Sequence, residues 1–202
     1  MKSSKFLWAL ILMMPLNVFA EKISFGGQVG WSIPKGEVFE PEKDQKSAKG
    51  GLNVDADVLY HFSLLGNRLA AGVTYNGSIL FGAKYGNWDN MSIGLYGLSL
   101  YGAKGYFKIL PGPLSPYVAL TAGVARLSTP EISVGGTVIS KSQKASAFGF
   151  RPEVGVKLSK FTISAGYIIP TNYSLLDGTT GITKNLSAGV LQISLGLRWG
   201  LL

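Results

Sequence analysis

The sequence predicts an all-β protein, an eight-stranded antiparallel up-and-down transmembrane β-barrel. Three observations lead to this fold class. Hydrophobic residues alternate with small or polar ones at a period of two, in segments that recur eight times along the chain. The connections between these segments are alternately short and long. The composition is rich in glycine, with 27 residues, and only 15% of residues are charged, against about 25% in soluble domains.

Residues 1–20 have the pattern of a secretory signal peptide. Lys2 and Lys5 form a basic start, residues 6–14 are apolar, and Val18 and Ala20 provide a small-residue cleavage site. The apolar run is much shorter than the ~20 residues of a membrane-spanning helix, so an uncleaved anchor is the weaker alternative. We therefore expect residues 1–20 to be removed on export and residues 21–202 to form the barrel.

The alternation is clearest in residues 52–64. All the even-numbered positions there are apolar, whereas the odd-numbered ones include Asn53, Asp55, Asp57 and His61. No later stretch approaches 18 uninterrupted apolar residues, which excludes a bundle of membrane-spanning helices. The same pattern, applied along the chain, predicts strands at residues 22–33, 52–64, 69–81, 92–107, 116–128, 145–158, 161–170 and 186–201.

Two of these strands are less regular than the others. The strand 92–107 has bulky apolar residues at both odd and even positions, so its phase is ambiguous. Pro152 in the strand 145–158 removes a hydrogen-bond donor from the ladder, and we expect a bulge or a local break there.

The connections give the layout of a bacterial outer-membrane barrel, which has an even number of strands, short turns at one end and long loops at the other. Residues 65–68, 108–115 and 159–160 are the short turns, and residues 34–51, 82–91, 129–144 and 171–185 are the long loops.

Size and charge indicate which face of the strands points outward. The interior of an eight-stranded barrel is only just wide enough for side chains to fill it, and the apolar set is numerous and bulky. The opposite set is mostly Gly, Ser, Thr and Ala, which suits a crowded lumen. We therefore expect the apolar set to face lipid, with aromatic residues such as Phe25, Trp31 and Trp199 near the strand ends. A secreted β-sandwich is the alternative.

The last strand carries the most specific family signal. Residues 194–201 read Ser-Leu-Gly-Leu-Arg-Trp-Gly-Leu. This segment is similar to the C-terminal signal that the barrel-assembly machinery recognises in barrel proteins, with Gly196, Trp199 and Leu201 at its key positions. Leu201 and Leu202 stand where a terminal aromatic residue is common. In architecture, the mature chain resembles the small outer-membrane barrels of Gram-negative bacteria: the OmpX group, the opacity proteins and the OmpA transmembrane domain. The resemblance implies export to the outer membrane and contact with the assembly machinery.

Six charged residues, three of each sign, fall on the lumen face. We expect an ion-pair network that fills the barrel, because buried charges persist only when they are paired. The alternative is the polar lining of a narrow channel, in which Arg151 and Glu153 would set selectivity. The set comprises Asp55, Asp57, Arg151, Glu153, Lys157 and Arg198.

His61, Ser63 and Asp57 share a face, which raises the alternative of a lipid-modifying hydrolase. Strand neighbours two apart lie ~6.8 Å from each other, too far for a catalytic relay, and the sequence has no G-x-S-x-G motif. We therefore expect no catalytic residue and no enzyme activity. With no cysteine and one histidine, we also expect no metal and no cofactor.

The loops are the best candidates for contact with a partner. Residues 131–140 predict a hairpin with a Gly135-Gly136 turn, which would prolong two strands. The resemblance to the OmpX group implies a protruding sheet whose exposed edge could pair with a partner strand. A stiff loop without a partner is the alternative. The first long loop has no net charge and predicts a mobile, solvated segment, and Trp88 and Tyr173 predict exposed aromatics. The hairpin residues are Glu131, Ile132, Ser133, Val134, Thr137, Val138, Ile139 and Ser140.

Together these features predict a monomeric, non-enzymatic barrel of the outer membrane with a structural or surface-interaction role through its extracellular loops. A narrow passive channel is the second hypothesis and the hydrolase is the third. The basic residues are scattered, so we expect no nucleic-acid partner. Lys84 and Arg126 near the outer rim fit the phosphates of lipopolysaccharide, which with outer-membrane lipid is an expected partner.

Overall fold

The computed structural model describes residues 22–40, 47–63, 65–82, 91–134, 137–170, 172–176 and 182–200. The predicted signal peptide, Lys84, Trp88, the Gly135-Gly136 turn and Leu201 lie outside these residues. Within the described ranges, no helix has the length and apolar character needed to cross a membrane.

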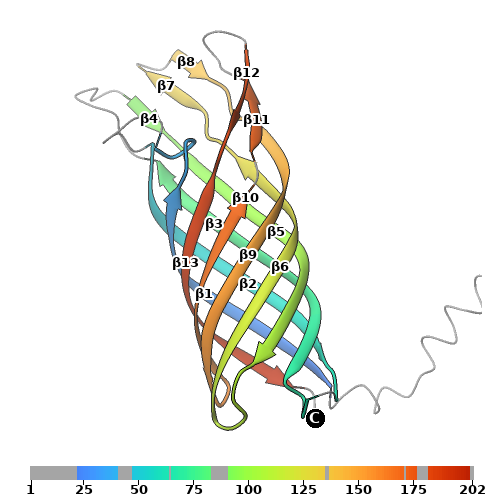
Figure 1. Ribbon diagram of the computed structural model, residues 1–202. Helices are drawn as coiled ribbons and strands as arrows, with labels where there is room; N and C mark the ends of the chain where they lie inside the picture. Colours follow the sequence, from blue (N-terminus) through green and yellow to red (C-terminus); the bar gives the residue numbers. More distant parts are fainter. Residues whose placement is uncertain are drawn as a thin grey trace, which may run out of the picture.

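Eight antiparallel strands close into one barrel (Figure 1), which confirms the predicted fold class. Each barrel strand pairs with the barrel strands before and after it in the chain, and the last pairs with the first from Ser24 opposite Gly200 to Lys35 opposite Gly189. The strands are β1 (Ile23–Lys35), β2 (Ala48–His61), β3 (Leu69–Gly82), β5 (Leu95–Lys108), β6 (Leu114–Ser128), β9 (Lys144–Leu158), β10 (Phe161–Pro170) and β13 (Gly189–Gly200).

The apolar face of each strand lies on the outside, as the sequence predicts. In β2, the side chains of Leu52 and Val54 are 56% and 53% exposed, whereas those of Asn53 and Asp55 are 1% and 6% exposed. Closure gives the backbone groups of every barrel strand a partner on both sides, which a medium without water requires. At this level the barrel is therefore apolar outside and polar inside, the reverse of a soluble protein.

The structure shows the phase of β5 and the pairing of β9, the two strands whose patterns are irregular in the sequence. In β5, Tyr96, Leu98 and Leu100 point into the lumen, so both faces of this strand are apolar near the long loops. In β9, the irregularity expected at Pro152 is a local break in pairing with one neighbouring strand, and no bulge forms. The strand runs unbroken in register with β6, and only its pairing with β10 is interrupted, between Glu153 and Phe150. The missing N–H of Pro152 thus affects one side of the strand and leaves its register intact.

Among the residues that the structure describes, five short strands lie beyond the long-loop end of the barrel (Figure 1). β4 (Met91–Ile93), β7 (Ile132–Val134) and β8 (Thr137–Ser140) form one sheet, and β11 (Tyr173–Leu176) pairs with β12 (Thr183–Leu186). The predicted hairpin is present as β7 and β8, but it does not prolong the barrel strands. It belongs to a separate three-stranded sheet, in which β7 pairs with β8 on one side and with β4, from the second long loop, on the other.

We expect Val29→Lys, at the central outward position of β1 and 62% exposed, to lower the free energy of unfolding in phospholipid vesicles by about 2–4 kcal/mol. Leu158→Lys, at the short-turn end of β9, is the control and should cost at most about 1 kcal/mol. Urea titration followed by tryptophan fluorescence measures both. Equal, small losses at the two positions would contradict a lipid-facing outer wall.

Candidate functional site

The middle of the lumen holds a network of buried charges. At its centre is Lys104 of β5, whose Nζ lies 3.0 Å from Oδ2 of Asp57 and 2.9 Å from Oε2 of Glu153. These three side chains come from β5, β2 and β9, so the ammonium group links strands on different sides of the barrel. All three are almost fully buried. Each charge is thus compensated at short range, as burial requires.

Two arginines complete the network. Arg151 donates to Glu153, to Asp55 Oδ2 at 3.1 Å and to Gln192 Oε1 at 2.6 Å. Arg198 on β13 donates to Asp57, with Nη1 2.8 Å from Oδ1. The ion-pair network therefore has three acidic and three basic members and no net charge: Asp55, Asp57, Lys104, Arg151, Glu153 and Arg198.

Five of the six charges assigned to the lumen from the sequence lie together in this network. The sixth, Lys157, lies nearer the short-turn end of β9, opposite Ser115, and makes no ion pair with any described residue. Sequence reasoning missed Lys104 because the phase of its strand was ambiguous. The signal was nevertheless present: Lys104 has the same parity as Tyr96, Leu98 and Leu100, all of which point inward.

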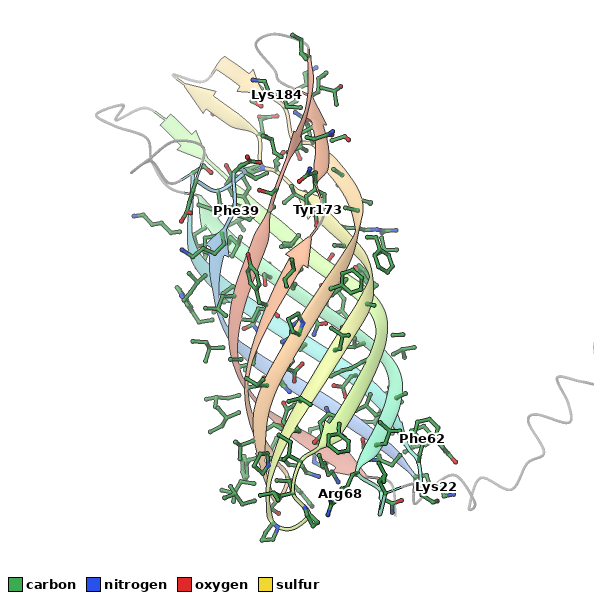
Figure 2. All side chains as sticks on the ribbon, viewed as in Figure 1. Lys22, Phe39, Phe62, Arg68, Tyr173 and Lys184 are labelled. Carbon is green, nitrogen blue, oxygen red and sulfur yellow. The ribbon has the colours of Figure 1, made fainter. Side chains whose placement is uncertain are left out.

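An apolar layer closes the lumen at the long-loop end. Phe39, from the turn that follows β1, packs edge-on against Tyr96 of β5, with ring centroids 5.5 Å apart. Tyr173 of β11 is fully buried in the same layer. Figure 2 shows Phe39 and Tyr173 at this end, with Phe62 and Arg68 at the other. The layer comprises Phe39, Ala48, Leu80, Tyr96, Leu98, Leu100, Ala125, Leu127, Ile168, Tyr173, Leu175, Ala188 and Val190.

Two sequence predictions about the loops are therefore wrong. The first long loop is not solvated throughout, because Phe39 is buried and the Ser47 hydroxyl donates to the carbonyl of Val38 at 2.7 Å. Tyr173 is not an exposed aromatic. In both cases the open mouth of the barrel provides an apolar surface that these side chains cover.

A second group of rings lies below the charges, toward the short turns. The rings of Tyr106 and Tyr117 are 4.7 Å apart, and the Tyr117 hydroxyl donates to Oε1 of Glu153 at 2.8 Å. The guanidinium group of Arg198 lies over the Tyr106 ring, 5.2 Å from its centroid. Along the lumen, the apolar layer, the charged network with its uncharged polar neighbours, and the aromatic pair thus follow one another.

The residues of the hydrolase hypothesis do not form a relay. His61 Nε2 lies 2.8 Å from the Ser24 hydroxyl, while Asp57 is held by Lys104 and Arg198. Ser63 is exposed beyond the end of β2. Across the described ranges, no group of three or more His, Asp and Glu side chains is arranged to hold a metal ion.

The remaining candidates lie on the loops and on the last strand. Glu131 and Val138 are exposed, and Ser133 and Ser140 are half-buried; for Ile132, Val134, Thr137 and Ile139 only the backbone is described. On β13, Trp199 lies outward opposite Phe25. Gly196 is set so close to β1 that an added Cβ would meet the carbonyl of Gly27.

A closed eight-stranded antiparallel barrel with an apolar outer wall and a filled polar lumen defines the class of small outer-membrane barrels. No family model matches the chain, and no curated protein is significantly similar to it.

Solved structures of this class are similar to the chain. Ail, the attachment invasion locus protein of Yersinia pestis, matches with a TM-score of 0.55 and 16% identity over 89% of this chain and 99% of that one. Neisserial surface protein A matches with a TM-score of 0.55 and 17% identity over 88% and 96%. A major outer membrane protein of Thermus thermophilus matches with a TM-score of 0.52 and 12% identity over 88% and 98%. The chain therefore has the fold of the small outer-membrane barrels.

We expect Lys104→Met to lower the free energy of unfolding by about 3–5 kcal/mol, because it leaves two buried carboxylates short of their shared partner. The double variant Lys104→Met/Glu153→Gln restores a neutral network and should lose less than the sum of its two single variants. Urea titrations of the refolded barrels measure this coupling. Additive losses would contradict a direct interaction between Lys104 and Glu153.

Proposed function

We propose that this protein is a monomeric, non-enzymatic barrel of the Gram-negative outer membrane that acts through its extracellular surface. The observation that carries the proposal is the filled lumen: a charge-balanced network lies under an apolar layer that includes Phe39, Tyr96 and Tyr173. Such an interior stabilises the barrel, and we expect it to leave no continuous hydrated path for a solute. Function then belongs to the surfaces outside the lumen.

The loop end is the part of the barrel best suited to contact a partner. The sheet of β4, β7 and β8 stands beyond the barrel mouth, and β4 covers one edge of β7. Within the described strands, β8 pairs with β7 alone, so its other edge is available to an added strand. Among proteins of this fold, Ail has been crystallised with the heparin analogue sucrose octasulfate, which gives a precedent for ligand binding by a small barrel.

Biogenesis follows from the same hypothesis. The signal peptide at residues 1–20 would direct export and be cleaved. The assembly machinery would then recognise the last strand through Gly196, Trp199 and Leu201, and outer-membrane lipid with lipopolysaccharide would surround the finished barrel.

We expect the mature protein to be electrically silent in a planar bilayer, because its lumen is filled. A heat-shift gel first confirms that the inserted sample is folded. Discrete conductance steps that change with Arg151→Ala or Glu153→Ala would contradict the proposal and favour the narrow channel.

Deleting Glu131–Ser140 should abolish the adhesion of bacteria that display the protein to cultured epithelial cells, because the deletion removes β7 and β8. The deleted protein should still show the heat shift of a folded barrel, since both strands lie outside the barrel sheet. A matched control replaces the same residues with a Gly/Ser linker of equal length. Unchanged adhesion of both variants would exclude this sheet as the contact surface.

A further inference from the structure

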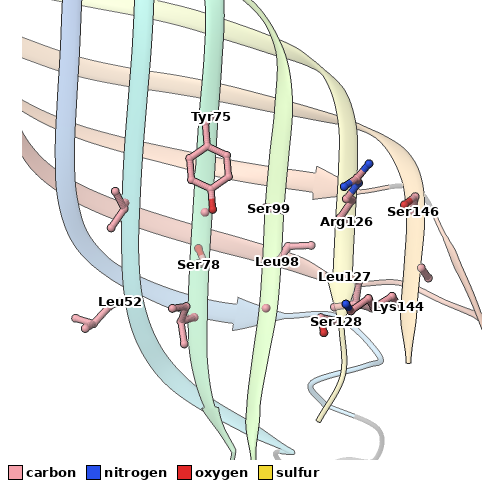
Figure 3. Close-up of a pocket in the computed structure, with 15 residues that line it drawn as sticks. Leu52, Tyr75, Ser78, Leu98, Ser99, Arg126, Leu127, Ser128, Lys144 and Ser146 are labelled. Carbon is pink, nitrogen blue, oxygen red and sulfur yellow. The ribbon is translucent and has the colours of Figure 1, made fainter. Parts of the chain in front are cut away.

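The outer wall of the barrel contains a groove that neither the lumen nor the loops explain. It runs across β2, β3, β5, β6 and β9 near the long-loop end and encloses about 630 Å³ (Figure 3). This volume lies in the range of small-molecule and lipid sites, about 300–1,000 Å³.

Small residues on neighbouring strands create the groove. Strand pairing places Gly77 beside Ser99 and, one step closer to the loops, Gly97 beside Ser128. Large outward side chains such as Leu52, Ile79 and Tyr101 border this run of small residues, so the run leaves a depression. Tyr75 leans over Gly77 at one end of it, where an added Cβ would meet the Tyr75 hydroxyl group.

The two sides of the groove differ in chemistry. Leu52, Val54 and Ile79, each more than half exposed, form an apolar side. The other side carries Arg126 on β6 and Lys144 at the start of β9, and none of the described lining residues is acidic (Figure 3). Arg126 makes a cation–π contact with Tyr101, whose ring centroid lies 5.6 Å from the guanidinium carbon.

From this arrangement we infer that the groove binds a phosphorylated, acylated lipid of the outer leaflet, with an acyl chain along Leu52, Val54 and Ile79 and a phosphate between Arg126 and Lys144. The inference rests on the proposed location of the barrel in the outer membrane. Lys144 is the first residue of its strand, so the cations lie at the loop end of the wall, where lipid headgroups meet water. Arginine and lysine are the side chains that bind phosphate most strongly.

The alternatives fit the groove less well. A soluble anion would use the cations but not the apolar side. A second copy of the chain, related by a two-fold axis, would bring Arg126 and Lys144 toward the same residues of its partner, and like charges repel. A neutral lipid would fill the apolar side and leave both cations without a partner.

The test is equilibrium binding of fluorescently labelled diphosphoryl lipid A to the mature protein in phosphatidylcholine nanodiscs. Arg126→Gln/Lys144→Gln should raise the dissociation constant about 10-fold or more, because it removes two charge-assisted contacts. The control Arg68→Gln/Lys160→Gln removes the same charge at the short-turn end and should change it by less than about 2-fold. Filling the groove with Ser99→Phe should also weaken binding, whereas Ala165→Phe, on the outer face of β10, should not.

Each contrary outcome has a definite meaning. Equal affinity for dephosphorylated lipid A, or an equal effect of both charge-removing variants, would overturn the phosphate site. A dimer seen by native mass spectrometry that disappears when Ser99→Phe fills the groove would assign the groove to a second copy instead. If the wild-type protein fails to insert into bilayers, the proposed membrane location fails; if it inserts and the variants bind normally, only the groove assignment fails.

Discussion

The narrow interior of an eight-stranded barrel is the constraint on which the rest of this structure depends. With this number of strands, side chains from opposite walls meet across the lumen, so a charge on one strand is within reach of charges on several others. Lys104 illustrates the result, since its ammonium group contacts carboxylates from two other strands. In such a space the dehydrated charges must balance, and the six members of the network do.

The same constraint explains the glycines that face the lumen. At Gly26 an added Cβ would lie 2.6 Å from Asp57 Oδ1 and 2.8 Å from Arg198 Nη2, and at Gly166 it would lie 2.6 Å from the guanidinium carbon of Arg151. Each arginine head therefore occupies the space that a side chain on a neighbouring strand would take. Glycine in these strands has a packing role that offsets its unfavourable strand propensity.

The period of two predicted the strands and their two faces, because a residue's parity decides its face once a strand is in register. The alternation of short and long connections, with the size and charge of the two faces, distinguished a barrel from a sandwich. The period of two placed Asp55, Asp57, Arg151, Glu153 and Arg198 on the inner face, where the structure has them. Their pairing depends on the relative stagger of strands far apart in sequence, which a one-dimensional pattern does not contain. In β5 the pattern failed for a physical reason: the apolar layer makes the inner face as hydrophobic as the outer one, which hid the phase and with it Lys104.

Residues outside the barrel strands carry no such periodicity. Phe39 and Tyr173 lie in segments without a regular alternation, and only the closed barrel reveals an apolar mouth for them to cover. The groove on the outer wall was hidden in the same way, since its small residues come from neighbouring strands and are ordinary in each strand alone.

A barrel that fills its own lumen has two kinds of surface left for interaction, the loop sheets and the outer wall. These surfaces meet at the long-loop end, where β6 ends at Ser128 and β9 begins at Lys144. The segment between them contains β7 and β8. At its base, the backbone N–H of Gln143 donates to the Thr129 hydroxyl at 3.1 Å and so holds the two ends of the segment together. A lipid phosphate held at Lys144 would thus lie one residue from the base of the hairpin. The cationic side of the groove and the hairpin are therefore held by the same short stretch of chain, Gln143 and Lys144.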